Sequence, residues 1–277
     1  MNYNIRKANR EEMKFFVDWA ADEGWNPGLH DDECFYETDP SGFIVGEHNG
    51  RIVGAISAVA YDKTFGFIGF YIVQPEHRNT ALAPLLARHA MRHLSTQNIG
   101  LDGVFDKVDK YENIGFRLAY RNLRYEARIK GKNSKNIIPL SELPFDDILR
   151  YDNKYFPTQR AVFLDKWLKL PDSKSYCIQY DNDLMGYGMI RKCRNGFKIG
   201  PLFAENHDIA EELLLSLSVE ANGDFIYLDV PEINKDGIKI AKKYNMKECF
   251  GTARMYSKEF PNIPINKIFG VTSFELG

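Results

Sequence analysis

The sequence predicts a mixed α/β (α+β) protein built from two successive units, each with a mostly antiparallel sheet flanked by helices. Two observations support this fold class. Residues 42–73 contain three apolar runs rich in Val, Ile and Phe, joined by turn signals at Asn49-Gly50 and around residues 62–64, which is typical of a β-meander. A similar order of elements then returns after residue 136. Sequence identity between the two halves is slight, so the repeat is inferred from the order of the predicted helices and strands.

Length and composition limit the function classes. The chain has 277 residues, enough for two ordinary domains, with 44% hydrophobic and 27% charged residues and a net charge of -2. This composition is typical of a soluble globular protein and offers no general attraction to nucleic acid or anionic lipid. No run of about 18 apolar residues occurs, so membrane spanning and secretion are not predicted, and a cytoplasmic protein is expected. The four scattered cysteines predict reduced thiols.

The elements of the first half follow in order. Apolar residues recur at helical spacing from Met13 to Ala20 after Asn9, a typical N-cap, and this helix is expected to end before the turn at residues 26–28. After the meander, the pattern predicts four elements. These are a helix over about 83–94, a strand over 99–105, a helix over 109–115 that ends at Gly115, and a strand over 119–129.

A polar segment without apolar periodicity, residues 130–136, predicts a boundary between a domain at 1–129 and a second at 137–277. Strands are predicted in the second half at 136–140, 176–193 (a hairpin through Asn182), 196–203, 225–230 and 253–260. Helices are predicted within 143–168, 208–219 and 234–246.

The stretch "VQPEHRNTALAPLL", residues 73–86, connects the third meander strand to a helix. Such a junction directs unpaired backbone N–H groups and the positive end of the helix dipole toward one place, which suits a phosphate. The alternative is a plain strand-to-helix connection.

The element order, this loop and the later "KYENIGF" together resemble the GNAT acyl-CoA N-acyltransferases. The stretches "EGWNPG", "DPSGFIVGE", "LDGV", "FRLAYRNLRYE" and "FGVTSFELG" resemble bacterial two-domain members, in which a GNAT domain precedes a GNAT-like domain. The resemblance covers nearly the whole chain. It implies a tandem GNAT fold and acetyl-CoA as co-substrate.

The resemblance also implies where acetyl-CoA binds. The family's diphosphate loop, Arg/Gln-x-x-Gly-x-Gly/Ala, falls on Arg78, Asn79, Thr80, Ala81, Leu82 and Ala83. Ala81 stands where the family usually has glycine, and a Cβ there makes a positive φ or a close phosphate approach costly. The backbone near Ile72 and Val73 is implied to hold the pantetheine arm like an added strand.

Acetyl transfer to an amine needs a neutral amine, a donor for the oxyanion and a proton for the leaving thiolate. The resemblance assigns the last role to Tyr111, four residues before Gly115, and a phenol with a pKa near about 10 suits it. The alternative for Tyr111 is an aromatic anchor of its helix. The oxyanion donor is expected to be a backbone N–H near Val73.

The base is not evident, because residues 65–73 contain no carboxylate where many relatives carry a glutamate. Asp102 and Glu23 are the first candidates and Asp106 the third, each with the alternative of a cap or turn carboxylate. The acidic loop at residues 21–39 is expected to border the acceptor site, with Trp25 and Asn26 as substrate-binding candidates. A solvated acidic surface is its plain alternative.

In the second half, the corresponding loop "PLFAENHDIAEELL" has no glycine and no basic residue, and Glu205 and Asp208 would repel a diphosphate. The second domain is therefore predicted not to hold acetyl-CoA in the usual way, and to shape the acceptor site or stiffen the first domain.

Together these features predict an N-acetyltransferase acting on a primary amine of a small molecule. A protein-lysine or N-terminal acetyltransferase and a catalytically weak CoA-binding or interaction protein are the alternatives. The six histidines do not cluster, and although His89 and His93 lie one helical turn apart, no metal is expected. Nucleic acid and membrane are not expected as partners, and the oligomeric state is open.

Overall fold

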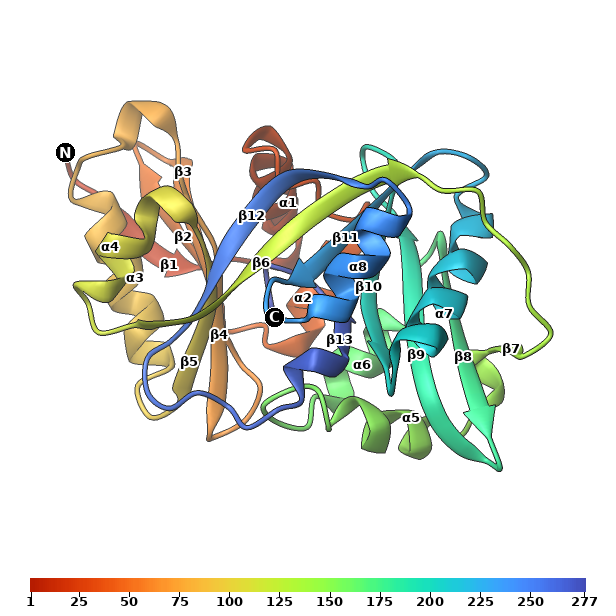
Figure 1. Ribbon diagram of the computed structural model, residues 1–277. Helices are drawn as coiled ribbons and strands as arrows, with labels where there is room; N and C mark the ends of the chain where they lie inside the picture. The colour runs from red at the N-terminus through yellow and green to blue at the C-terminus, as the bar shows by residue number, and fades with distance from the viewer.

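One continuous sheet runs through the computed structural model, which describes residues 1–277 (Figure 1). Its 13 strands follow the order β1-β2-β3-β4-β5-β12-β6-β11-β10-β9-β8-β7, and β13 pairs with β10. Only the pairs β4–β5 and β10–β11 are parallel. The strands are β1 (Asn4–Lys7), β2 (Phe43–His48), β3 (Arg51–Ala60), β4 (Phe65–Val73), β5 (Asn98–Val104), β6 (Arg117–Arg128), β7 (Ile137–Pro139), β8 (Ser173–Tyr180), β9 (Asp183–Lys192), β10 (Phe197–Ala204), β11 (Phe225–Pro231), β12 (Lys247–Tyr256) and β13 (Ile268–Gly270).

Helices cover both faces of each half. The helices are α1 (Met13–Asp22), α2 (Asp31–Thr38), α3 (Leu82–His93), α4 (Val108–Glu112), α5 (Phe145–Asp152), α6 (Ala161–Trp167), α7 (His207–Glu220) and α8 (Lys235–Lys243). In the first half α1 and α2 share one core with β2 to β4, and α3 packs in another core on the opposite face. In the second half α7 and α8 pack in one core, and α5 and α6 in another. The predicted mixed, mostly antiparallel architecture is confirmed.

Two local features differ from the sequence prediction. Asn9 does not cap α1 directly: it caps a short 3-10 turn, Arg10–Glu12, through a capping box with Glu12, and α1 follows. The acidic segment predicted as a loop at residues 21–39 contains α2, whose polar composition gives no helical apolar stripe. Its buried face, with Cys34 and Phe35, is fixed by packing against the second half instead.

The final strand of each half lies between strands of the other half. β12, near the end of the chain, pairs with β5 of the first half on one edge and with β6 on the other, and β6 pairs with β11 of the second half. In Figure 1, β6 and β12 run side by side across the molecule and join the two groups of elements. The domain boundary at residues 130–136 therefore remains a prediction. The sheet continues from one half to the other without a break.

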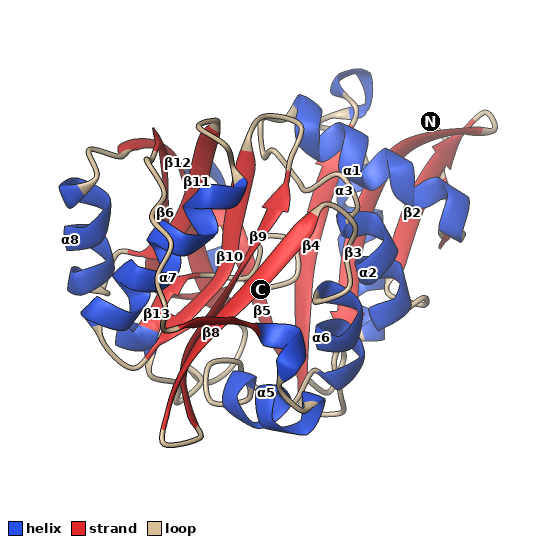
Figure 2. Cartoon of the chain, turned by 90° about the vertical axis from the view of Figure 1, so that its right-hand side faces the viewer, coloured by secondary structure: helices blue, strands red, loops and turns tan.

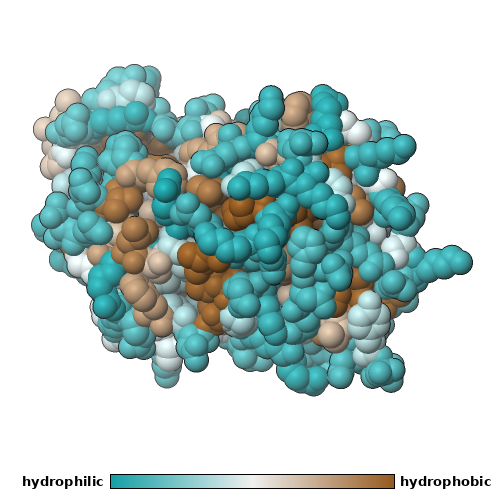
Figure 3. All heavy atoms as spheres, viewed as in Figure 1, coloured by the Kyte–Doolittle hydropathy of each residue, from teal (hydrophilic) through white to brown (hydrophobic).

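The halves share a hydrophobic core. α1 and α2 pack with α6, where the Phe35 and Trp167 rings stack with centroids 5.9 Å apart. The last seven residues, 271–277, are all buried, and the C-terminus lies in the middle of the molecule in both ribbon views (Figures 1 and 2). On the face in Figure 3, apolar side chains gather toward the middle of a mostly hydrophilic surface.

None of the helices is both long enough and apolar enough to cross a membrane. No group of three or more His, Cys, Asp or Glu side chains is placed to hold a metal ion.

Candidate active site

The first feature of the site is the separation of β4 from β5. The two strands pair only between Phe65–Ile68 and Asn98–Leu101. Immediately beyond, Phe70 has a φ of +48°, and the pairing of β4 with β3 changes register. A positive φ at a bulky residue is strained and marks a bulge that turns the strand. The edge of β4 at residues 71–73 consequently has no strand partner on the β5 side, so an extended ligand arm can pair there.

The second feature is the free N-terminus of α3. Ala81 is its N-cap but has no side chain to cap with, and no backbone carbonyl accepts from the N–H groups of Thr80, Ala81 or Ala83. Ala81 adopts an ordinary φ of -69°, and the positive φ in this loop, +61°, falls on Asn79, a residue type that tolerates it. The conformational cost expected for Ala81 is therefore absent. Free donors at the positive end of a 12-residue helix suit a phosphate.

Arg78 lies at the mouth of this loop. Its Nε donates to the carbonyl of Val73 at 2.9 Å, and its Nη2 forms an ion pair with Glu23. Both side chains are more than a third exposed, so the pair adds little stability. Arg78 consequently holds Glu23 at the loop between β4 and α3 and compensates the negative charge of Glu23.

Two tyrosines face the gap from either side. The Tyr111 ring of α4 packs on Gly103 of β5, where an added Cβ would lie 2.6 Å from the ring. Burial, and then the charge of Asp106, raise the pKa of Tyr111 to about 12. Burial, and then Tyr111, likewise raise the pKa of Tyr71 to about 12, while the Tyr71 hydroxyl donates to the carbonyl of Ala83 at 2.6 Å. Both phenols therefore remain protonated at neutral pH, as a proton donor must.

Asp102 lies in a buried ion pair. Its carboxylate accepts from Arg254 Nε at 3.0 Å and Nη2 at 2.6 Å, and from Asn122 at 2.9 Å. The side chain is fully buried, and Arg254 comes from the exchanged strand β12. Both oxygens of this carboxylate are therefore already occupied by donors of the protein. We therefore do not retain Asp102 among the candidate bases, and its structural role is to join the halves.

The loop between α1 and α2 is fixed by the second half. The carbonyl of Trp25 accepts from Arg124 Nη1 at 2.6 Å and from Lys198 Nζ at 3.4 Å. The side-chain amide of Asn26 donates to the carbonyl of Asn195 and accepts from its N–H. Trp25 therefore contacts this buried charged region through its backbone carbonyl. The side-chain amide of Asn26 joins the loop after α1 to the turn between β9 and β10.

That region lies between the halves and contains buried ion pairs. Arg124 binds Asp229 through two hydrogen bonds of 2.6 and 2.7 Å, and Arg191 binds Asp31 through two of 2.9 and 3.2 Å. Asp31 belongs to the acidic segment for which a solvated surface was the plain alternative, yet it is completely buried. Lys198 is also buried, and burial followed by the Arg124 charge lowers its pKa. We name this cluster of charges and the Trp25 carbonyl the inter-half chamber.

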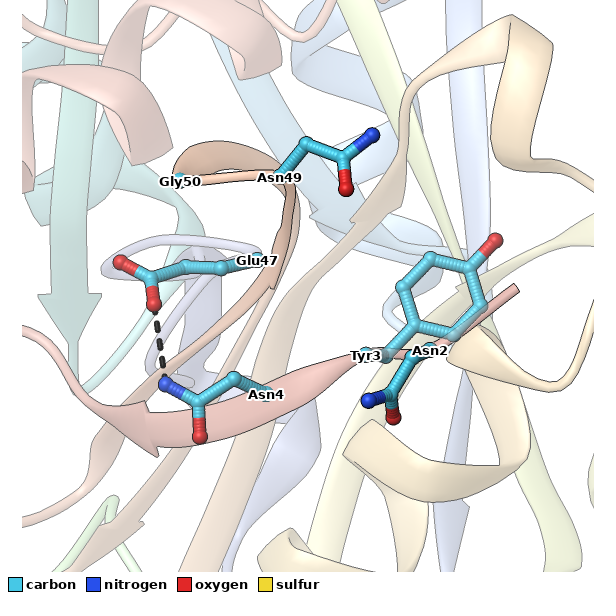
Figure 4. Close-up of a pocket in the computed structure, with 6 residues that line it drawn as sticks. All are labelled: Asn2, Tyr3, Asn4, Glu47, Asn49 and Gly50. Carbon is cyan, nitrogen blue, oxygen red and sulfur yellow. Dashed lines mark hydrogen bonds between the residues drawn. The ribbon is translucent and has the colours of Figure 1, made fainter.

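A surface hollow elsewhere contributes nothing to this site. It has a volume of about 370 Å³ and is lined by residues of β1, β2 and the turn after β2 (Figure 4). Asn4 and Glu47 face each other across it in a 3.0 Å hydrogen bond. None of the predicted site residues lines this hollow, and only Tyr3 among its six residues is hydrophobic.

Two family models match the chain. Residues 5–116 match the acetyltransferase (GNAT) family, and residues 148–270 match an acetyltransferase (GNAT) domain. The chain belongs to the GNAT acyltransferases. Its two GNAT domains together account for most of its length.

Similar proteins support this assignment along the whole chain. Holothin acyltransferase of Pseudoalteromonas sp. (strain SANK 73390) is 28% identical over 280 residues, covering 99% of this chain and 95% of that protein. The uncharacterized N-acetyltransferase YitH of Bacillus subtilis (strain 168) is 21% identical over 188 residues, 66% of each chain.

Two solved structures share the fold. A putative acetyltransferase from Pyrococcus horikoshii superposes with a TM-score of 0.85 at 20% identity, over 99% of this chain and 96% of that one. A tandem GNAT protein from the clavulanic acid biosynthesis pathway gives a TM-score of 0.63 at 12% identity, over 94% and 100%.

The second GNAT domain has the same gap, but the chain fills it. β10 and β11 pair only between Phe197–Ile199 and Ile226–Leu228, and β13 then pairs with β10 at Leu202 and Phe203. The helix that follows, α7, is capped by Asn206, whose side chain accepts from the N–H of Ile209 at 3.1 Å. Its anion position and its strand gap are both occupied by protein groups.

Proposed function

We propose that this GNAT acyltransferase transfers an acetyl group from acetyl-CoA to a primary amine of a small molecule. The observation that carries the proposal is the open gap between β4 and β5 beside the uncapped N-terminus of α3. A thioester arm with a diphosphate needs an unpaired strand edge and a group of free N–H donors. The first domain has both features, at the two ends of the loop that joins β4 to α3.

Each part of the first domain has a separate role in this reaction. The free amides of the loop at residues 78–83, those of Thr80, Ala81 and Ala83, hold the diphosphate, and the free edge of β4 at Ile72 and Val73 holds the pantetheine arm. Acetyl-CoA supplies the activated acetyl group as a thioester. A backbone N–H near Val73 donates to the thioester oxygen, and Tyr111 gives its proton to the leaving sulfur. The structure supports the last role because the phenol is held beside the gap and stays protonated.

A small acceptor is favoured over a protein by the position of the second domain. The loop after α1 is bonded to β9, β10 and the turn between them, through Leu29 to Lys192 at 3.0 Å and through Asn26 to Asn195. The polar groups near it, among them Asp31, Arg191 and Lys198, are buried between the halves instead of lining an exposed surface, which favours a small acceptor. The name of the relative holothin acyltransferase supports acyl transfer as the reaction class.

We further propose one acetyl-CoA site per chain. β13 takes the place of the pantetheine arm in the second domain, and Asn206 takes the place of the diphosphate. The second domain then serves to close the acceptor side of the first.

Isothermal titration with acetyl-CoA tests the cofactor site. We expect one equivalent to bind. The matched variant is Ala81→Asp, which places a carboxylate beside the free N–H groups at the start of α3. A negative charge at a helix N-terminus is favoured by about 0.3–1 kcal/mol, so the melting temperature should not fall. The carboxylate repels the diphosphate, so the dissociation constant should increase at least tenfold.

Two results would contradict the proposal. Binding of two equivalents of acetyl-CoA per chain would place a second molecule in the second domain. An unchanged affinity in Ala81→Asp would show that the diphosphate does not bind at the N-terminus of α3. Transfer itself is measured as release of the CoA thiol in the presence of a panel of small amines and of lysine peptides. Turnover with peptides alone favours a protein acceptor, and binding without turnover favours the catalytically weak alternative.

A further inference from the structure

The final segment of the chain, residues 271–277, is anchored between the halves although it forms no helix or strand. Arg160 Nη2 donates to Thr272 Oγ1 at 2.9 Å, and the Tyr61 hydroxyl donates to the carbonyl of Leu276 at 2.9 Å. The guanidinium of Arg160 is itself fully buried and paired with Asp152. Anchors from both halves therefore fix the path of this segment.

This path places Glu275 at the point where β4 and β5 separate. An added Cβ on Gly69 would lie 2.0 Å from the Glu275 carbonyl oxygen and 3.1 Å from its Cα. Gly69 is the residue after Ile68, the last residue of β4 that pairs with β5. The segment continues along the same face of β4, because an added Cβ on Gly277 would lie 2.9 Å from the Phe67 ring. A glutamate from the end of the chain thus lies where residues 65–73 supply no carboxylate.

The Glu275 carboxylate is buried without a partner. The residue is 1% exposed, and neither Oε1 nor Oε2 has a hydrogen-bond partner. The other acids with buried side chains, Asp31, Asp102, Asp152 and Asp229, are each paired with an arginine. An unpaired buried carboxylate is costly, and such groups in native proteins call for a functional explanation. Glu275 is therefore the one buried carboxylate without a hydrogen-bond partner.

Charged groups from several elements face Glu275 in the inter-half chamber. The cations are Arg124 of β6, Arg191 of β9 and Lys198 of β10, all of which sense the Glu275 charge. The anions Asp229 and Asp31 neutralise the two arginines. The Nη1 atom of Arg191 is also buried without a partner. The inter-half chamber thus includes an acceptor and a donor that are both buried without a hydrogen-bond partner, and such groups call for an explanation.

We propose that Glu275 is the general base that takes a proton from the acceptor amine. The inference rests on the proposed acetyl transfer. Of the two protons that the ammonium nitrogen loses, one goes to the Glu275 carboxylate, directly or through a water, and then to solvent. The nitrogen lone pair forms the C–N bond to the acetyl carbon, the C–S bond breaks, and the sulfur takes a proton from Tyr111. The second nitrogen proton restores the Tyr111 phenol.

Substitution Glu275→Gln tests this role in the full chain. It keeps the shape and removes the charge, so kcat for amine transfer should fall about 10²–10⁴-fold, the usual contribution of a general base. Acetyl-CoA affinity measured by titration should not change. The melting temperature should hold or rise, because a buried, unpaired charge is removed. The matched control is Glu259→Gln, an exposed glutamate, which should retain wild-type kcat.

A second readout separates a base from a structural charge. In the variant, the rate deficit should shrink for acceptor amines of low pKa, which are already neutral at the assay pH, and the acidic limb of the kcat/KM profile should follow the pKa of the acceptor amine alone. Wild-type kcat in Glu275→Gln overturns the assignment while leaving the acetyltransferase proposal intact. No turnover by the wild type with any amine contradicts that proposal instead.

If Glu275→Gln does not fold, Glu275→Asp gives the answer, because it keeps the carboxylate and retracts it by one methylene. A base predicts a reduced kcat that still shows the acidic limb. An equal rate loss for every amine, whatever its pKa, overturns the assignment.

Discussion

At the scale of single residues, the partner of a carboxylate decides its role. Asp102 and Glu275 are both buried acids near the gap between β4 and β5, but Asp102 is held by Arg254 whereas Glu275 has no partner. The family resemblance ranks Asp102 and Glu23 ahead of Asp106, because strand ends and the segment before the meander border the acceptor site in this fold. It cannot reveal that a residue 152 positions later supplies the counter-ion of Asp102.

The two tyrosines at the gap provide the residue-scale prediction. Tyr111→Phe should lower kcat about 10²-fold or more with unchanged acetyl-CoA affinity, because the sulfur loses its proton donor. The matched variant Tyr71→Phe loses one hydrogen bond to Ala83, worth about 1 kcal/mol, and should retain kcat within tenfold. Stopped assays of CoA release measure both. The opposite ranking would transfer the acid role to Tyr71.

The same tyrosine predicts a pH profile. Because its pKa is raised to about 12, Tyr111 carries its proton throughout the accessible range. The alkaline side of kcat up to about pH 10 should therefore show no loss from this group, whereas an unperturbed phenol would begin to lose activity near about pH 10.

At the scale of elements, β4 is the strand on which the site depends. Its bulge at Phe70 opens the gap, its first half pairs with β5, and Gly69 receives the last segment of the chain. The glycine is required by that close approach. The apolar run at residues 65–73 predicts the strand correctly but contains no sign of the bulge, because Phe70 is an ordinary strand residue.

Gly69→Ala tests this contact. Its Cβ would overlap a backbone carbonyl, which cannot rotate away as a side chain can, so the segment at residues 271–277 must shift. We expect a loss of about 1–3 kcal/mol in the free energy of unfolding, as for other overpacked sites, together with a fall in kcat. Urea titration and turnover measure the two effects.

Gly54→Ala on neighbouring β3 is the control for that variant. There the added Cβ would lie 3.0 Å from methyl groups of Leu82 and Leu86, which are the mobile ends of side chains. A smaller loss of stability and normal turnover are expected. Equal behaviour of the two variants would show that residues 271–277 do not depend on Gly69.

At the scale of the whole molecule, the exchange of β6 and β12 makes the two GNAT domains one folding unit. β6 has no strand of its own half as a neighbour, since both its partners, β11 and β12, come from the second half. Buried ion pairs such as Arg254 with Asp102 follow the same exchange. Removal of either half leaves such charges uncompensated, which costs about 3–5 kcal/mol per pair.

We therefore expect a single unfolding transition. Tryptophan fluorescence and far-UV circular dichroism should give coincident urea midpoints, although chains of this length often unfold domain by domain. Residues 1–129 expressed alone should not form the native sheet, which amide hydrogen exchange would detect as missing protection in β5 and β6. Two separate transitions, or a protected fragment, would mean that the exchanged strands are not needed.

The sequence by itself determined most of the elements, with the exception of α2, together with their order, the tandem GNAT family and the loop beside α3, because hydrophobic period, turn residues and short motifs are local in the chain. Only the tertiary structure decided which strand completes which half, that Asn79 and not Ala81 takes the positive φ, that β13 fills the second gap, and that Glu275 lies beside β4. The exchanged strands, the position of β13 and that of Glu275 depend on contacts between residues far apart in the chain, and packing and charge compensation at that range leave no periodic signal in one sequence.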